Sequence, residues 1–252
     1  MSVWDEYRAR MEVIGNNRRS AHYNRGAYSI NSHLPNSLSY FDVTIDGKKQ
    51  TVAIMNSDNL NEKTIISLPG EDVRHGGLVH WMDQYWLITE KDYNTIMYGK
   101  GYLLQCNFML KWITEDGVIH EQWCCVEDGT KYLTGEMEDR NFTVTRGDSR
   151  IAVTIAKNDD TAKLNRESRF LIDDPKSPKM LSYLLTKPLK LGMSYGDDGV
   201  YKFVLQEVTA TADDNFELQI ADYYKYFPKN DNASDDTSTD NNSESNGKKV
   251  WL

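Results

Sequence analysis

Histidine, cysteine and acidic side chains are the groups of this sequence that could catalyse a reaction or bind a metal. The five histidines are scattered, and His75 and His80 lie far from Cys106 along the chain, so only the fold could assemble a zinc site. There is no G-x-S-x-G nucleophile elbow and no G-x-x-x-x-G-K phosphate loop. We expect Asp173-Asp174 and Asp213-Asp214 to be solvated loop acids. The sequence therefore predicts no active site, cofactor or metal.

The three cysteines do not form a disulfide framework. They are Cys106, Cys124 and Cys125, an odd number with one adjacent pair. All three lie in strand-like runs, where a thiol packs as a small hydrophobic group. We expect buried free thiols.

Composition narrows the class of protein. The chain has 252 residues, of which 39% are hydrophobic, and a net charge of -9. It is long enough to bury a core, and its negative charge argues against binding nucleic acid through phosphates. There is no apolar run of 18 residues, which predicts no membrane span. The first 13 residues lack an apolar signal core, so we expect no secretion.

Strand patterns dominate residues 40–126. Asp46-Gly47 is a favoured hairpin turn, and a second turn is predicted at Met82-Asp83-Gln84. Residues 102–112 alternate strongly, which predicts one strand whose inner face carries Leu104, Cys106, Phe108, Leu110 and Trp112. This spacing of strands and turns predicts an all-β barrel or sandwich.

The same pattern continues more weakly to residue 226. We expect a barrel-like domain over residues 39–175 and a further β region over residues 176–228. A strand is predicted at 142–145, and a late hairpin is predicted over 201–221, around Asp213-Asp214-Asn215.

Residues 1–38 are expected to form a short helix followed by a polar arm. Trp4, Tyr7, Met11 and Ile14 recur at spacings of three and four, which predicts an amphipathic helix over residues 3–14. A helix of this length is marginal alone, so its apolar stripe must dock, either on its own domain or on a neighbouring subunit.

The polar segment at residues 16–37 contains Arg18, Arg19 and Arg25 without balancing acids and shows no periodicity. It predicts either an irregular surface loop or an extended arm that becomes ordered on a partner.

Residues 229–252 form an acidic, polar tail that ends in Trp251 and Leu252. Residues 229–247 hold too few apolar side chains to offset chain entropy, so we expect disorder there. The apolar end is either a tethered docking peptide or a terminus without a role.

The order of several short motifs resembles the head-tail connector, or neck, proteins of tailed bacteriophages, whose head-closure members are small β-barrels. The resemblance runs over roughly residues 60–175. After a polar arm and a strand ending in Pro69 come Gly77-Leu-Val-His-Trp, Tyr85-Trp-Leu-Ile-Thr, Gln105-Cys-Asn-Phe-Met-Leu-Lys-Trp and Arg169-Phe-Leu-Ile-Asp-Asp.

The resemblance implies a non-enzymatic virion protein that forms a ring with copies of itself, between a portal-side adaptor and the tail terminator. Such a ring retains DNA, which passes through its lumen without specific binding. We expect its contacts to use Trp4, Tyr7, Met11, Arg18, Arg19, Arg25, Trp251 and Leu252. Two alternatives stay open: a tail-completion or host-adhesion β-module, and an enzyme acting on glycans through two suitably spaced carboxylates.

Overall fold

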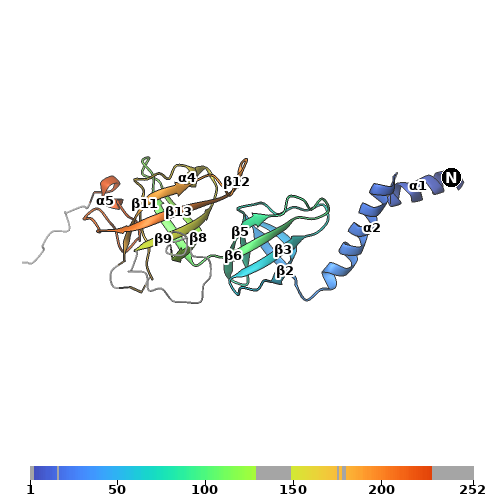
Figure 1. Ribbon diagram of the computed structural model, residues 1–252, viewed down its shortest axis with the longest axis horizontal. Helices are drawn as coiled ribbons and strands as arrows, with labels where there is room; N and C mark the ends of the chain where they lie inside the picture. The colour runs from blue at the N-terminus through green and yellow to red at the C-terminus, as the bar shows by residue number, and fades with distance from the viewer. Residues whose placement is uncertain (1–2, 16, 129–148, 175, 178–179, 229–252) are drawn as a thin grey trace, which may run out of the picture.

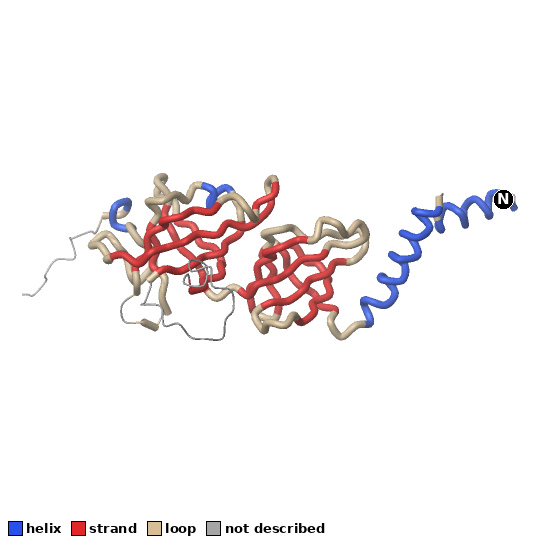
Figure 2. The backbone as a smooth tube through the Cα atoms, in the orientation of Figure 1, coloured by secondary structure: helices blue, strands red, loops and turns tan. Residues whose placement is uncertain are grey.

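The computed structural model describes residues 3–228 apart from residues 16, 129–148, 175 and 178–179. Its described part is mainly β and elongated: two helices project from a first β-barrel, and a second, larger sheet follows (Figure 1). The same order of helices, barrel and second sheet is visible along the backbone tube (Figure 2). The predicted all-β class with an N-terminal helix is confirmed. The strand predicted at 142–145 lies outside the described residues.

Two helices precede the barrel, where we predicted only one. They are α1 (Val3–Ile14) and α2 (Arg18–His33), and a 3-10 turn, η1 (Leu34–Asn36), follows. The prediction of an irregular or extended segment over residues 16–37 was therefore wrong. Most of that segment is helical, and its inner side carries Tyr23, Ala27 and Ile30, all half-buried. This is a helical spacing that the surrounding polar residues concealed.

A reciprocal cap starts α2. The Ser20 backbone N–H donates to the Asn17 side-chain oxygen at 2.8 Å, and the Asn17 backbone N–H donates to the Ser20 hydroxyl at 3.0 Å. This capping box uses serine where glutamate or glutamine is usual. Gly15 makes the turn between the helices with φ +116°, and a Cβ there would lie 2.5 Å from the Ser20 Oγ. Only glycine fits such a turn without strain.

The first barrel is closed by backbone hydrogen bonds in the order β1-β2-β3-β6-β5-β4, with β4 pairing back to β1. Both predicted tight turns are present: Asp46-Gly47 has φ values of 48° and 80°, and Met82-Asp83 has 49° and 57°. Positive φ at both central positions matches the right-handed twist of a two-residue hairpin. The strands are β1 (Tyr40–Ile45), β2 (Lys48–Asn56), β3 (Glu62–Ser67), β4 (Leu78–Trp81), β5 (Gln84–Lys91) and β6 (Lys100–Gln105).

Aliphatic and tryptophan side chains from all six strands fill the first barrel. Ile65, Val79, Ile88 and Leu103 are completely buried there, and Trp86 is nearly so. Such alternation of inward apolar and outward polar residues is what the strand pattern of residues 40–105 requires.

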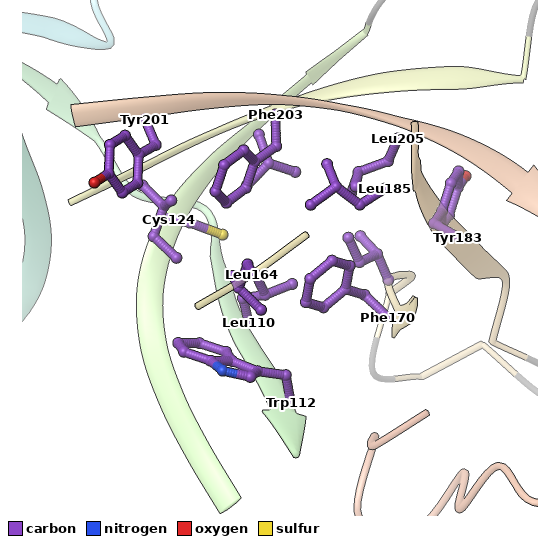
Figure 3. Packing of buried hydrophobic residues seen from close by; sticks show 13 residues of the cluster. Leu110, Trp112, Cys124, Leu164, Phe170, Tyr183, Leu185, Tyr201, Phe203 and Leu205 are labelled. Atoms are coloured by element: carbon purple, nitrogen blue, oxygen red, sulfur yellow. The ribbon is translucent and has the colours of Figure 1, made fainter. Parts of the chain in front are cut away.

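The second sheet follows the order β10-β11-β13-β9-β8-β7, with β12 paired to β13. Its core gathers residues from five of these strands, including Leu110, Cys124, Phe170 and Phe203 (Figure 3). Its elements are β7 (Phe108–Ile113), β8 (Ile119–Asp128), β9 (Arg150–Ala156), α4 (Asp159–Ala162), β10 (Arg169–Leu171), β11 (Ser182–Leu189), β12 (Ser194–Tyr195), β13 (Asp198–Val208) and α5 (Tyr223–Tyr226).

The strand predicted over residues 102–112 is in fact two strands in two different sheets. β6 ends at Gln105 and β7 begins at Phe108. The inward residue of β6 is Leu103, not Leu104, which packs instead against the second sheet. The alternation is real within each strand, but the two connecting residues carry the chain from one core to another. The boundary therefore lies near residue 106, whereas we expected a division near 175.

The late hairpin predicted over 201–221 is absent from the described structure. β13 ends at Val208, and beyond it only an isolated bridge joins Asn215 to Ile220. The expectation that Asp214 is a solvated loop acid was also wrong, since its side chain is completely buried. Side-chain contacts, not strand pairing, hold this last segment.

The barrel and the second sheet share an apolar interface. Leu87 and Cys106 pack with Cys125, Ala156 and Val200. The interface explains why the linking residues are buried. It also buries Cys106 beside Cys125, with 3.9 Å between the two Sγ atoms. All three cysteines are free and buried, as predicted.

A direct backbone contact reinforces this interface. The Gly199 N–H, in the β12–β13 turn, donates to the His75 carbonyl oxygen at 3.0 Å. A Cβ on Gly76 would lie 2.0 Å from the Gly199 carbonyl oxygen, so a side chain there cannot be accommodated. The two β regions are thus held in one relative orientation.

Candidate functional site: the N-terminal helical arm

We call α1 and α2 together the helical arm. Its first helix exposes a stripe of large apolar residues: Val3 is 81% exposed, Trp4 72% and Tyr7 55%. The Trp4 and Tyr7 rings meet edge to face, with centroids 6.3 Å apart. Residues three apart lie on one side of a helix, so the two rings form one aromatic surface. So large an apolar surface on a 12-residue helix is a candidate protein contact.

The outer side of α2 is basic. Arg18, His22 and Arg25 follow one another at spacings of four and three and are exposed, and Arg19 is exposed beside them. No acidic residue occurs in the helix. Arg18 and Arg19 occupy its first turn, where positive side chains oppose the helix dipole. A carboxylate from a partner would offset both the dipole and the arginines.

A loop of the first barrel positions α2. A Cβ at Gly26 would lie 2.6 Å from the Met97 Cε, so the methionine side chain rests directly on the helix at this glycine. Met97 belongs to the connection between β5 and β6. The helical arm therefore projects from the barrel at a set angle, with its apolar and basic faces turned outward (Figure 1).

The helical arm collects most of the predicted contact residues. Trp4 and Tyr7 share a face of α1, and the three arginines lie on α2. Met11 lies in α1, but its side chain is not among those described. Trp251 and Leu252 lie outside the described residues, so the structure does not relate the tail to the helical arm.

A second surface was not predicted from the sequence. A cavity of about 510 Å³ opens at the far end of the second sheet, between the β7–β8 turn, the segment after α4, and α5. We call it the C-terminal cavity; its lining includes Trp112, Leu164, Arg169 and Tyr226. Trp112 lies at the edge of the core cluster (Figure 3). The aromatic run at residues 223–227 was the signal in the sequence that could have indicated it.

A buried ion-pair network, which we call the clasp, closes one side of this cavity. The Arg169 guanidinium donates to both Asp214 carboxylate oxygens, at 3.0 and 2.9 Å, and to the Asp222 carboxylate at 2.7 Å. The Thr211 and Asp222 backbone N–H groups donate to Asp214 as well. The clasp therefore fastens residues 211–222 to β10.

Protonation equilibria reflect the same network. Burial raises the pKa of Asp214, but the backbone N–H donors and the Arg169 guanidinium outweigh it, and its pKa is lowered from the ordinary 3.8. Burial lowers the pKa of Arg169, but the two carboxylates outweigh this and raise it. Both groups thus stay charged, which is the condition for a stable buried pair.

Other reactive side chains are engaged in packing. Burial raises the pKa of the Cys124 thiol, and the hydrogen bond with Cys106 together with burial raises that of Cys125. His75 is buried, with its Nε2 donating to the Thr89 carbonyl oxygen at 2.8 Å and its Nδ1 3.4 Å from the Tyr93 hydroxyl. Such thiols are poor nucleophiles.

Two absences apply to the residues that the structure describes. No group of three or more His, Cys, Asp or Glu side chains among them is arranged to hold a metal ion. Within the same part of the chain, no helix is both long and apolar enough to cross a membrane.

Comparison with known proteins gives one family match. The model of the YomX N-terminal domain, a phage-associated family, matches residues 17–105, which are α2 and the first barrel. This match suggests a phage protein. It covers about a third of the chain and leaves the second sheet outside.

Comparisons with curated proteins and with solved structures add little. No curated protein matches the chain. One solved structure, described as MrkH, a novel c-di-GMP dependence transcription regulatory factor, aligns with 74% of this chain and 85% of its own. The sequence identity is 10% and the TM-score 0.24, so this likeness carries no argument about fold or function.

Proposed function

We propose that this chain is a virion structural protein of a phage neck: a ring-forming, non-enzymatic subunit of the head-tail connector. In this role it would retain packaged DNA and join the tail to the head. Its partners would be copies of itself, a portal-side adaptor and a tail terminator. The phage-associated family match supports the class of protein.

The observation that carries the proposal is the projecting helical arm. It exposes Trp4 and Tyr7 on one helix and three arginines on the next, while a barrel loop fixes its direction. Exposed aromatic and arginine side chains are typical of the central residues of protein interfaces. A fixed arm that extends away from its own domains is suited to contacting a neighbouring subunit.

Charge supports the proposed passage of DNA without specific binding. The first 38 residues contain five arginines and three acidic residues, a net charge of +2, so the remaining 214 residues carry -11 of the total of -9. A body of this sign repels phosphate and would not hold DNA in a channel. The basic residues that do occur together lie on the helical arm, where we place protein contacts.

Two measurements test the proposal. Native mass spectrometry of the purified chain should detect a closed oligomer, and antibody labelling of phage particles in the electron microscope should mark the junction of head and tail. Labelling at the distal tail would instead favour the host-adhesion module. A protein that is monomeric and missing from particles would overturn the proposal.

A further inference from the structure

Two apolar surfaces lie at opposite ends of the molecule. One is the α1 stripe of Val3, Trp4 and Tyr7. The other surrounds the C-terminal cavity, where Phe216, Leu218, Tyr226 and Phe227 are between 38% and 42% exposed. α1 and α5 are at the two ends of the long axis (Figure 1), so the two surfaces of one chain do not meet.

We propose that α1 of one copy docks at the C-terminal cavity of a second copy, in a head-to-tail contact. This inference rests on the proposed function, which requires self-assembly, and adds which two surfaces meet. A contact between unlike surfaces leaves one of each free at the ends of any dimer. It therefore continues until a ring closes or a filament grows.

Size and chemistry fit an aromatic helix face. The cavity volume of about 510 Å³ lies in the range of pockets that enclose groups of this size. Leu164 and Tyr226 supply apolar lining for the two rings. The Trp112 Nε1–H is buried and has no acceptor among the described residues, so an oxygen such as the Tyr7 hydroxyl would satisfy it.

Charge favours the same occupant. Glu115, Asp116 and Glu167 line the cavity, are exposed, and form no ion pair among the described residues. The two cavity lysines are already paired within the chain, Lys163 with Asp160 at 3.5 Å and Lys225 with Asp222 at 2.8 Å. The rim is thus left acidic.

The regions that carry the two surfaces also have opposite charge. Residues 106–228 contain 15 basic and 21 acidic residues, a net charge of -6, whereas residues 1–38 carry +2. On the helical arm, Arg8 follows Tyr7 directly and is exposed, and Arg18 and Arg19 begin the next helix. Opposite potentials across an interface guide association and fix its register.

Site-directed cross-linking tests the contact. Glu6→Cys places a thiol on α1 and Glu167→Cys places one on the cavity rim, both at exposed positions, while the native cysteines are buried. A short bis-maleimide should link the two variants only when they are mixed. Glu6→Cys mixed with Lys48→Cys, an exposed position on the first barrel, is the matched control. Equal yields in the two mixtures would overturn the inference.

Affinity separates this inference from the proposed function. Trp4→Ala should weaken self-association roughly 30-fold or more, as truncation of an interface anchor does. Tyr28→Ala, which removes an aromatic ring that is 77% exposed on α2, should leave it nearly unchanged. A ring that persists with Trp4→Ala and gives no α1-to-cavity cross-link refutes the docking site alone. A wild-type monomer that is missing from particles refutes the proposed function too.

Discussion

The two β regions of this chain are closed in different ways. The first barrel is closed by backbone hydrogen bonds around its whole circumference, through the pairing of β1 with β4. The second sheet runs from β10 to β7, which lie next to each other without a ladder between them in the described structure. Beside that opening, the clasp joins β10 to the last segment of the chain. Backbone closure tolerates most substitutions, whereas closure by side chains depends on single residues.

Removing the centre of the clasp should have the largest effect. Asp214→Ala leaves Arg169, whose side chain is 11% exposed, without its main partner, and it frees two backbone N–H donors. We expect a loss of about 3–5 kcal/mol in the free energy of unfolding of the second sheet. Urea unfolding followed by hydrogen exchange will report the two β regions separately.

The control for this variant is Glu217→Ala, at an exposed position in the same segment, which should change stability by less than about 0.5 kcal/mol. If Asp214→Ala behaved like Glu217→Ala, the clasp would have no role in closing the second sheet.

The next variant separates the two β regions instead of opening one. Gly76→Ala introduces a methyl group 2.0 Å from the Gly199 carbonyl oxygen at φ +79°. Gly70→Ala is the matched control, because Gly70 has φ +87° but no atom within 4 Å of the added Cβ. We expect about 1 kcal/mol for Gly70→Ala and about 2–4 kcal/mol for Gly76→Ala. Cooperative unfolding of both regions should become two transitions in Gly76→Ala; equal costs would show that the contact is unimportant.

Acid should weaken the second sheet through the clasp. Because the pKa of Asp214 is lowered in the folded protein, its charge contributes stability that is complete well above pH 3.8. That contribution is lost as the pH falls below 3.8 through the folded-state pKa. We expect a smaller effect than with Asp214→Ala, since a protonated carboxyl still accepts hydrogen bonds.

The measurement is the free energy of unfolding of the second sheet across this pH range, with Asp214→Asn as the reference. The amide cannot ionise, so its profile should lack the acid step. An identical profile in the two proteins would contradict the assignment.

Prediction from sequence succeeded where one strand and one turn specify the local fold. Asp46-Gly47 and Met82-Asp83 need positive φ at both positions, and the flanking alternation fixes which side is buried. It failed at residues 102–112, because alternation continues across Cys106 and Asn107 although the chain changes sheets. Periodicity records burial but does not say in which core a residue is buried.

The candidate site was predicted in part for a similar reason. The exposed aromatic residues of α1 were evident from their spacing, but α2 was missed because its capping box uses serine and its apolar residues are few. The C-terminal cavity was missed entirely. It brings together residues 112–116, 163–169 and 221–226, and only tertiary structure joins such distant segments.

The helical arm has neither a ladder nor a clasp, so variants in it should change association with little effect on folding. Arg19→Glu should strengthen α2 by about 0.5 kcal/mol, because a carboxylate in the first turn complements the helix dipole. It should nevertheless weaken self-association, since it reverses a charge that faces an acidic partner. Arg25→Glu, one and a half turns further along, should weaken association without that gain in helix stability. Hydrogen exchange of α2 amides and sedimentation of the same samples will measure both quantities, and stronger association with Arg19→Glu would mean that the basic face meets something other than an acidic surface.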